Sequence, residues 1–339
     1  MSNEPQVTDH DFLVQVKNLT KFFPIQRGFW SKTVGYVQAL KDINLGIKKR
    51  QIIGIVGESG SGKSTLGKLI LKLLEPTDGE ILYKERNIFS LSNKEMRSIR
   101  QRLQIVFQNP YSSLSPRMKI KDIIAEPIIV HKIIQDKEGI MKRVNELLNL
   151  AGLEEQHGNK YPHELSGGQR QRVAIARALS LSPEFLILDE PVSALDVSVQ
   201  AQILNLLIDL QKKLNLTYLF ISHNLSVVSY ISTQIAVMYL GRIVEFGHKE
   251  DIIKSPKHPY TIALLSANPE IGDLRSKLRK EKRIILSGEI PDPSNPPSGC
   301  VFRTRCPIAK ERCTSEIPKL ELYNNQQVAC HYAGELKLN

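Results

Sequence analysis

The first 299 residues of this 339-residue chain contain no cysteine, and all four cysteines lie in the last forty residues. No apolar run approaches the ~18 residues that would indicate a membrane span. The first ten residues are polar and include acids, which does not fit a secretory signal peptide. We therefore expect a soluble or peripheral protein of the cytoplasm. The clustering of the cysteines indicates a local site near the end of the chain.

The net charge of the chain is +11, and its densest basic run is Arg275–Arg283. A basic surface suits nucleic acid, anionic lipid headgroups or an acidic partner. No aromatic residue interleaves with this run, as a platform for stacked single-strand bases would require. We interpret the run as a solvated helix face or a linker and expect no nucleic-acid partner.

Short, continuous apolar segments recur along the chain and are typical of parallel strands buried on both faces. They are Ile52–Val56, Phe185–Leu188, Tyr218–Ile221 and Ile235–Tyr239. Helical spacing of apolar residues follows at Leu66–Leu74, which Pro76 should end, and at Gln171–Leu181. Strands that alternate with helices predict an α/β layer architecture.

The remaining segments differ in pattern. Phe12–Val16 and Ile43–Ile47 alternate like half-buried strands, and Gln104–Phe107 reads as another strand. Residues 112–164 are mostly helical in pattern, with Pro116 and Pro127 as breaks. From about residue 255, frequent prolines predict an irregular C-terminal extension that contains every cysteine.

A glycine-rich loop, Gly57 to Ser64, lies between the first buried strand and the first helix. It matches the P-loop pattern and the strand–loop–helix context that the pattern requires. Its backbone N–H groups can approach phosphate oxygens, helped by the positive end of the helix dipole. We expect Lys63 to reach the β- and γ-phosphates and Ser64 to bind Mg²⁺. The predicted binding set is Gly57, Ser59, Gly60, Ser61, Gly62, Lys63, Ser64 and Thr65.

Two acids, Asp189 and Glu190, end the apolar strand that begins at Phe185. Asp189 would hold the Mg²⁺ shell, as the acid of the second strand does in P-loop ATPases. Glu190 is placed to polarise the attacking water as a general base. An acid pair at a strand end can equally cap a helix, but beside a P-loop we favour the catalytic interpretation.

A second glycine-rich loop, Leu165-Ser166-Gly167-Gly168-Gln169, opens another predicted helix. The Ser166 hydroxyl and the amides of Gly167 and Gly168 would form a second anion site. With the P-loop and the acidic strand end, this loop resembles the signature motif of the ATP-binding cassette (ABC) family. The similarity runs from residue 12 to about residue 250.

That resemblance implies an ABC cassette of the P-loop NTPase class, with a RecA-like core, an antiparallel β-subdomain and a helical subdomain at about 112–168. It further implies that Ser166, Gly167, Gly168 and Gln169 close over ATP bound to a second cassette. A single chain should then bind ATP but hydrolyse it poorly.

The resemblance also assigns roles to single residues. Gln108 looks like the Q-loop glutamine, which contacts Mg²⁺ or water and senses the membrane partner. Ser193–Asp196 looks like the D-loop, and His223 like the histidine that contacts the γ-phosphate. Asn224 departs from the family, where many members have Asp, and this change could alter a local hydrogen bond.

Phe23 matches the position of the aromatic residue that stacks on adenine. Phe22 beside it is a competing candidate, and an ordinary core position is the alternative for Phe23.

Several segments resemble the ATPase subunits of oligopeptide and dipeptide importers. They are Phe23–Ile25, Phe107–Leu114, His258–Thr261, Ala263–Leu265 and Pro296–Cys300. The chain looks closest to the second, F-type subunit, with a nucleotide-binding domain at 1–254 and an extension at 255–339. The resemblance implies a heterodimer with a D-type ATPase, two membrane permease subunits and an extracytoplasmic peptide-binding protein. The expected location is the cytoplasmic face of the membrane, with the permease docking around Gln108–Met118 and the helical segment after it.

The four cysteines, Cys300, Cys306, Cys313 and Cys330, have the spacing C-x5-C-x6-C-x16-C. Zinc sites usually include a tight C-x2–4-C pair, which this chain lacks, and disulfides are rare in cytosolic proteins. Four thiolates suit a [4Fe–4S] cluster, and the resemblance implies one here. We favour iron–sulfur, with zinc and then free thiols as alternatives, and with His331 as a possible substitute ligand.

Three other functions remain open. One is a nucleic-acid-binding iron–sulfur protein, which the net charge and the cysteines would suit. A non-transport ABC ATPase of DNA repair or translation usually has two cassettes or a long coiled-coil insertion, and this chain has neither. The same transport mechanism with another small solute, such as nickel or glutathione, stays possible because other chains choose the cargo.

Overall fold

A computed structural model describes residues 11–28, 32–267, 286 and 288–336. Its contacts divide the chain into two compact units. Unit 1 contains the described residues of segments 1–48, 52–90 and 222–339, and unit 2 contains residues 49–51 and 91–221. The basic run Arg275–Arg283 lies outside the described residues. Among the helices that are described, none is long and apolar enough to cross a membrane.

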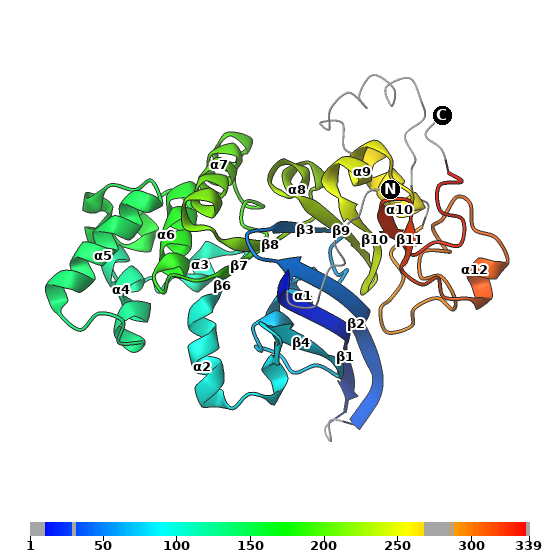
Figure 1. The fold of residues 1–339 in the computed structure, drawn as a ribbon, viewed down its shortest axis with the longest axis horizontal. Helices are drawn as coiled ribbons and strands as arrows, with labels where there is room; N and C mark the ends of the chain where they lie inside the picture. The colour runs from blue at the N-terminus through cyan, green and yellow to red at the C-terminus, as the bar shows by residue number, and fades with distance from the viewer. Residues whose placement is uncertain (1–10, 29–31, 268–285, 287, 337–339) are drawn as a thin grey trace. The chain divides into compact units, whose positions relative to one another are not determined.

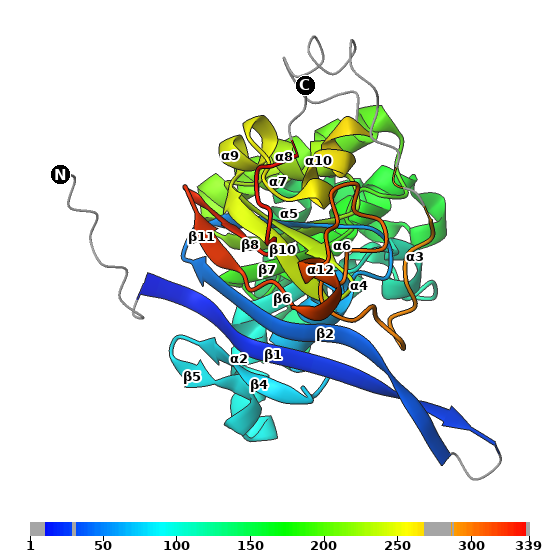
Figure 2. The ribbon, with the colours of Figure 1, turned by 90° about the vertical axis from the view of Figure 1, so that its right-hand side faces the viewer.

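Unit 1 contains an antiparallel sheet built on two long strands. Its members, in the order β2-β1-β4-β5, are β1 (Phe12–Arg27), β2 (Lys32–Lys48), β4 (Asp78–Tyr83) and β5 (Arg86–Asn87). Figure 2 shows β1 and β2 side by side along their length. The predicted strands Phe12–Val16 and Ile43–Ile47 were too short. Pairing continues to Arg27 and Lys32 although the outer residues are largely exposed, because the ladder satisfies backbone groups without requiring burial.

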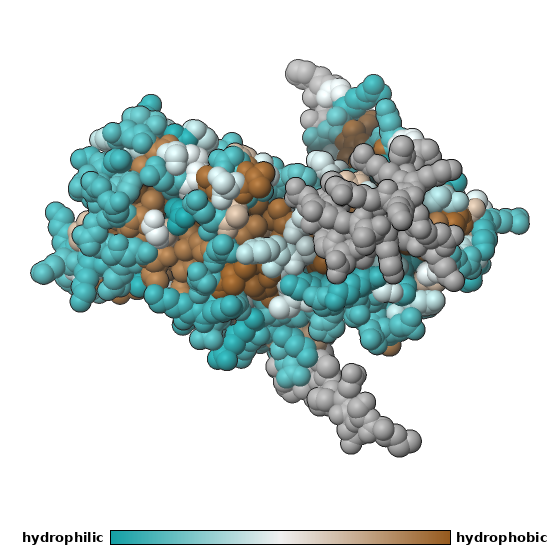
Figure 3. Space-filling view, turned by 90° about the horizontal axis from the view of Figure 1, so that it is seen from above, coloured by the Kyte–Doolittle hydropathy of each residue, from teal (hydrophilic) through white to brown (hydrophobic). Residues whose placement is uncertain are grey.

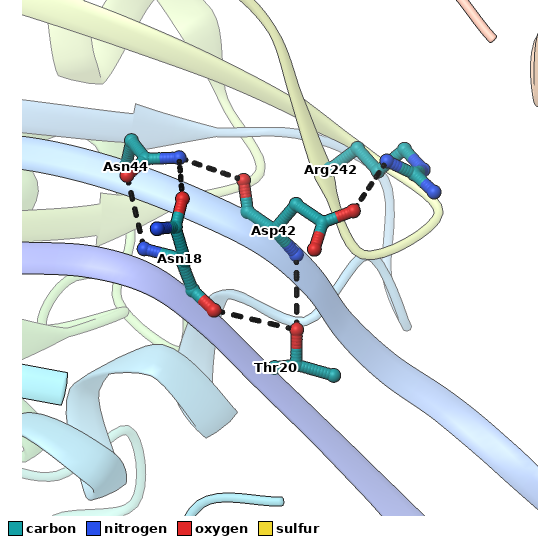
Figure 4. A network of polar contacts seen from close by, with 5 residues as sticks. All are labelled: Asn18, Thr20, Asp42, Asn44 and Arg242. Carbon is teal, nitrogen blue, oxygen red and sulfur yellow. Dashed lines mark hydrogen bonds and ion pairs between the residues drawn. The ribbon is translucent and has the colours of Figure 1, made fainter. Parts of the chain in front are cut away.

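A polar network stabilises the point where the register of β1 and β2 shifts (Figure 4). The Asn18 N–H donates to Asn44 Oδ1 at 2.9 Å, and Asn44 Nδ2 donates to Asn18 Oδ1 at 3.1 Å. The Asp42 N–H donates to Thr20 Oγ1 at 3.2 Å, and the Asp42 carboxylate lies 3.5 Å from Arg242. Side chains thus replace ladder hydrogen bonds that an irregular register cannot make.

A second group of strands in unit 1 carries the P-loop. These strands are β3 (Ile52–Val56), β9 (Gln234–Tyr239), β10 (Arg242–His248), β11 (Glu321–Tyr323) and β12 (Gln326–Val328). β3 and β9 are parallel, β10 is antiparallel to β9, and β12 extends the edge beyond β10. Both β3 and β9 are almost wholly buried, which confirms the two strands predicted there.

The helices of unit 1 are short. They are α1 (Lys63–Ile70), α8 (Leu225–Ile231), α9 (Lys249–Lys254), α10 (Pro259–Ser266) and α12 (Arg312–Ser315), with a 3-10 turn at Ile88–Ser90. The helix predicted to continue to Leu74 ends at Ile70. Lys72 has φ 50°, its N–H bonds to the Leu69 carbonyl, and the Leu73 N–H bonds to the Lys68 carbonyl. This Schellman motif stops the helix well before Pro76.

Unit 2 contains three parallel strands, in the order β8-β7-β6, and most of the long helices. The strands are β6 (Leu103–Val106), β7 (Phe185–Asp189) and β8 (Thr217–Ser222). The helices are α2 (Asn93–Arg102), α3 (Pro110–Ser113), α4 (Ile120–Val130), α5 (Lys137–Leu150), α6 (Gly167–Leu179) and α7 (Val197–Leu214), with 3-10 turns at Glu155–Asn159 and Pro162–Glu164. Figure 1 shows α4, α5 and α6 packed beside one another.

Two helix boundaries in unit 2 differ from the predictions. Pro116 lies between α3 and α4 as expected, but Pro127 lies inside α4. Buried Ile124 and Ile128 flank it, so packing outweighs the one backbone hydrogen bond that proline cannot donate. Helix α6 begins four residues before the predicted Gln171, because Ser166 caps its first turn.

The C-terminal extension belongs to unit 1. Its described part contains α10, α12 and the strand pair β11–β12, joined by irregular segments. The Ala329 N–H also donates to the Val244 carbonyl at 2.8 Å. The extension is therefore tied to the strand group that carries the P-loop. The boundary at residue 254 and the limits 112–168 of the helical subdomain remain predictions.

Candidate functional site

The P-loop joins β3 to α1 and has the backbone that phosphate binding needs. Gly60 and Gly62 have φ of 79° and 100°, values that side chains disfavour. A Cβ on Gly57 would lie 2.1 Å from the Met238 carbonyl oxygen, so this position requires glycine. Gly62 is the N-cap of α1 and no side chain caps the helix there. The first turn of α1 is therefore arranged as an anion site.

Lys63 lies within this loop rather than in solvent. It is 5% exposed, and its Nζ donates to the carbonyls of Gly57 and Glu58 at 2.8 and 2.9 Å and to Ser61 Oγ at 3.3 Å. The ammonium group is thus positioned at the phosphate-binding loop, where the sequence predicted a phosphate contact.

Two residues whose part in the site sequence reasoning missed support the loop through Glu58. Arg305 forms an ion pair with Glu58 at 2.7 Å, and the Tyr260 hydroxyl accepts a hydrogen bond from the Glu58 N–H at 2.9 Å. Glu58 is the one acid in the loop, which was the available signal that it requires a partner. Nothing in the sequence indicates that Arg305, 247 residues away, provides that partner.

In unit 2, the structure brings together two predicted catalytic residues. Asp189 is buried at the end of β7, and Glu190 follows it with φ 48°. Gln108 Nε2 donates to Glu190 Oε2 at 2.9 Å, and the Glu190 N–H donates to the Ile221 carbonyl at 2.9 Å. A left-handed backbone at a non-glycine residue is costly and is typical of functional sites.

The signature loop is folded around its own serine. Ser166 is the N-cap of α6, where its Oγ accepts from the Gln169 N–H at 3.3 Å while Gln169 Oε1 accepts from the Ser166 N–H at 2.9 Å. A Cβ on Gly168 would lie 2.5 Å from Val199, and one on Gly167 would lie 3.2 Å from Leu195. Glycine therefore lets the loop pack closely on the segment that opens α7.

The predicted D-loop, Ser193–Asp196, lies between the catalytic acid and α7. Ser193 Oγ donates to the Glu190 carbonyl at 3.1 Å. Asp196 caps α7 by accepting from the Val199 N–H at 3.0 Å, and this backbone hydrogen bond is the main reason why the pKa of Asp196 is lowered. Val197, the first residue of α7, is 80% exposed.

His223 and Asn224 follow β8. His223 is exposed, so it is not a core histidine. Asn224 caps α8, because its Oδ1 accepts from the Ser226 and Val227 N–H groups at 2.9 and 3.4 Å. Asparagine therefore serves here as the N-cap, a role that aspartate fills equally well.

Phe23 lies in β1 and is half-buried, and its role as the adenine-stacking residue stays a prediction. The Lys21 Nζ lies 5.0 Å from its ring centroid, and the Lys41 Nζ lies 5.5 Å from that of Phe22.

The four cysteines are free thiols in one region of the extension. The Cys300 N–H donates to the Cys313 carbonyl at 2.9 Å. Burial raises the pKa of Cys306 to about 11 and that of Cys330 to about 12. The charges of neighbouring cysteines raise both pKa values further. No three His, Cys, Asp or Glu side chains of the described residues group around one point that could hold a metal ion. The described residues therefore contain no assembled metal site that would support the zinc and iron–sulfur predictions.

Protein-family comparisons agree with these features. The family described as "ABC transporter" matches residues 40–193, and "Oligopeptide/dipeptide transporter, C-terminal region" matches residues 244–313. Among solved structures, the ATP-binding cassette MJ0796 bound to ADP and Pi has a TM-score of 0.62 and 33% identity, covering 70% of this chain and 98% of that one. The chain belongs to the ABC transporter family and has the ABC cassette fold of an ATPase that uses ATP and Mg²⁺.

Its relatives define the branch. The oligopeptide transport ATP-binding protein AppF of Bacillus subtilis (strain 168) is 48% identical, over 95% of this chain and 98% of that protein. The dipeptide transport ATP-binding protein DppF of Escherichia coli (strain K12) is 46% identical, over 94% and 93%. This chain therefore resembles ATP-binding proteins of peptide transporters along nearly its whole length.

Proposed function

We propose that this chain is the ATP-hydrolysing subunit of an importer of dipeptides and oligopeptides. The observation that carries the proposal is the coverage of the similarity. Relatives named for oligopeptide and dipeptide transport match almost end to end, and the extension matches the C-terminal region of the same transporters. The shared P-loop alone would support only a nucleotide-binding function.

Within unit 1, the P-loop amides and Lys63 bind the phosphates, Ser64 and Thr65 follow at the start of α1, and Ser64 provides a Mg²⁺ ligand. His223 contacts the γ-phosphate, which its exposure permits. Phe23 stacks on adenine, and its half-buried ring supports that role.

Within unit 2, Asp189 would hold Mg²⁺ and Glu190 would take a proton from the attacking water. The hydrogen bond from Gln108 to Glu190 orients the carboxylate. The strained backbone of Glu190 supports the assignment, because such strain persists where the surrounding structure holds a residue for function.

The signature loop serves ATP on a second cassette, so the active assembly is a pair, and we favour a D-type ATPase as the partner. We place the interface of this pair near the D-loop, where Val197 is exposed. Hydrophobic residues also gather in patches on the otherwise hydrophilic face in Figure 3.

A second surface of unit 2 suits a membrane permease. Tyr111 of α3, Ile129 and Val130 at the end of α4, and nearby Ile133 are apolar and roughly half exposed or more. Tyr111 lies in Gln108–Met118, and the other three lie at or just past the end of α4, the helical segment that follows it. We propose that two permease subunits bind here and hold the chain at the cytoplasmic face of the membrane, with an extracytoplasmic binding protein delivering the peptide.

We also propose that Cys300, Cys306, Cys313 and Cys330 ligate a [4Fe–4S] cluster with a structural role. Support comes from the thiols themselves, because none of the four forms a disulfide and all four lie in the described part of the extension. A cluster takes one thiolate per iron, so its ligands need not converge on one point as zinc ligands must. Anaerobically purified protein should be brown, and Cys313→Ala should be colourless. Colourless wild-type protein with stoichiometric zinc would favour zinc instead.

Uptake of a radiolabelled dipeptide by the producing organism tests the transport function. Cells whose only copy carries Lys63→Ala should lose uptake, and the wild-type gene should restore it. Unchanged peptide uptake together with lost nickel or glutathione uptake would reassign the cargo. Co-purification with nucleic acid and without permease chains would contradict transport altogether.

A further inference from the structure

The P-loop contains a carboxylate, Glu58, next to the amides that receive phosphate. All three polar groups of Glu58 are held by other residues. Its N–H donates to Tyr260 Oη at 2.9 Å, its carbonyl accepts from Lys63 Nζ at 2.9 Å, and its carboxylate accepts two hydrogen bonds from Arg305. The N–H and the carboxylate of this loop residue are therefore held from outside the loop, by Tyr260 and Arg305.

The contact with Arg305 is a bidentate, partly buried ion pair. Arg305 NH1 and NH2 donate to the two carboxylate oxygens of Glu58 at 2.7 and 3.2 Å. The Arg305 side chain is 8% exposed and that of Glu58 is 27% exposed. Paired planar groups fix direction as well as charge. Solvent screens a pair in this setting less than an exposed one, so removal of the arginine leaves an uncompensated negative charge.

A buried aromatic cluster supports this clamp. Phe302 lies 5.1 Å from the Tyr239 ring and 5.4 Å from the Tyr260 ring, and the two tyrosine rings are 4.8 Å apart. The Arg305 N–H donates to the Phe302 carbonyl at 3.0 Å. Tyr260 and Arg305, which both bind Glu58, are thus mounted on one packed core between the P-loop and the cysteine-bearing extension.

We propose that Arg305 is a positioning residue for ATP binding. It cancels the negative charge of Glu58, which would otherwise repel the triphosphate, and with Tyr260 it holds the loop so that Lys63 and the α1 amides face the nucleotide. The inference rests on the proposed nucleotide role of the P-loop. It gives the extension a direct part in the nucleotide site.

The test measures the dissociation constant of MgATP for the full chain, and KM and kcat for the assembled transporter. Arg305→Met should weaken MgATP binding by about tenfold, which corresponds to about 1.4 kcal/mol, because the uncompensated Glu58 carboxylate then repels the triphosphate. KM should rise accordingly, while kcat at saturating ATP changes little. Arg305→Lys should recover part of the affinity.

Substitution of Glu58 separates an electrostatic role from a merely structural one. Glu58→Gln should bind MgATP as tightly as the wild type or more tightly, because Arg305 is then an unpaired cation near the phosphates. Glu58→Gln should also restore much of the affinity that Arg305→Met loses. The proposal would be overturned if Arg305→Met and Glu58→Gln each weakened MgATP binding and the double variant bound MgATP no better than Arg305→Met. Normal MgATP affinity in Arg305→Met would also overturn it.

Arg303 provides the matched control. It lies in the same segment but donates to the Ser298 carbonyl at 2.8 Å and to Ser298 Oγ at 3.3 Å. Arg303→Met should therefore leave MgATP affinity unchanged. If Arg305→Met does not fold, the other two variants still decide the question. Arg305→Lys should bind MgATP more weakly than the wild type, and Glu58→Gln should bind it at least as tightly. Lys63→Ala must abolish MgATP binding, and if it does not, the nucleotide role itself is wrong.

Discussion

The P-loop and the signature loop are both glycine-rich and both open a helix, but they are stabilised in different ways. Helix α1 begins at Gly62 without a side-chain cap. Helix α6 begins at Ser166 with a capping box completed by Gln169. The first loop therefore leaves its helix end for a ligand, whereas the second satisfies its own amide and presents a serine hydroxyl.

Their support also differs. The P-loop is held by residues distant in the sequence, namely Met238 behind Gly57, Gly241 at Ser61, and Tyr260 and Arg305 at Glu58. The signature loop is held by its own capping box and by packing on Leu195 and Val199. We infer that distant residues shape the P-loop, whereas the signature loop is shaped mainly by its own turn and by the segment it packs on.

The largest expected effect distinguishes the function proposed for unit 2 from that proposed for unit 1. Glu190→Gln should lower turnover of the assembled transporter by about 10²–10⁴, because the general base is lost. It should leave MgATP binding intact, whereas Lys63→Ala should lose binding. Rapid-quench hydrolysis and equilibrium MgATP binding measure the two effects. Normal turnover in Glu190→Gln would remove the catalytic role from unit 2.

The catalytic role of the signature loop can be tested by comparing Ser166 with a second serine that caps a helix in the same way. Ser166→Ala should lower ATPase activity of the assembled pair by about 10²-fold, the scale of one lost oxyanion-type donor. MgATP affinity of the isolated chain should not change. The substitution also removes an N-cap, worth about 1 kcal/mol.

Ser92 is the control for that loss, since it caps α2 in the same capping box with Glu95. Ser92→Ala should lower the free energy of unfolding by a similar amount without affecting ATPase activity. Equal activity losses in both variants would show that Ser166 acts only as a cap.

The same contrast explains which features the sequence could predict. Features with local support were predicted, and features that depend on distant residues were not. The buried strands β3 and β9, the P-loop and the Ser166 turn depend on local patterns, and the structure contains them. The outer halves of β1 and β2 depend on pairing between exposed residues, so alternation missed them. Pro127 was misread because a proline flanked by buried Ile124 and Ile128 stays in a helix. Arg305 and Tyr260 reach the P-loop only through the tertiary fold.

A third prediction concerns the distant support of the P-loop. Glu245 is buried and accepts hydrogen bonds from the Lys257 and His258 N–H groups at 2.7 and 3.1 Å, just before the helix that carries Tyr260. Burial raises the pKa of Glu245 to about 7 from 4.5. The unfolded chain therefore releases this proton near pH 4.5 and the folded chain only near pH 7, so the stability from this group falls across that window.

Glu245→Gln imitates the protonated acid. Its free energy of unfolding, relative to the wild type, should rise by about 2–3 kcal/mol between pH 4.5 and pH 8. Denaturant unfolding at several pH values measures this difference. His258 works in the opposite direction, because burial lowers its pKa to about 3 and its contribution is lost as the pH falls below 6.5. In Glu245→Gln, the free energy of unfolding should therefore decline towards acid pH. A pH-independent difference would mean that Glu245 is ionised in the fold.

The smallest expected effect is at Asn224, where the support is local. Asparagine and aspartate cap helices about equally, so Asn224→Asp should change the free energy of unfolding by less than about 0.5 kcal/mol. Because the new side chain would accept the same Ser226 and Val227 N–H groups, the backbone that presents His223 should not move. ATPase activity of the assembled transporter should then stay near the wild-type value. Asn224→Ala, which removes the cap, should cost about 1 kcal/mol. If aspartate changed activity as strongly as alanine does, charge rather than capping would govern this turn, and the contrast between local and distant support would fail here.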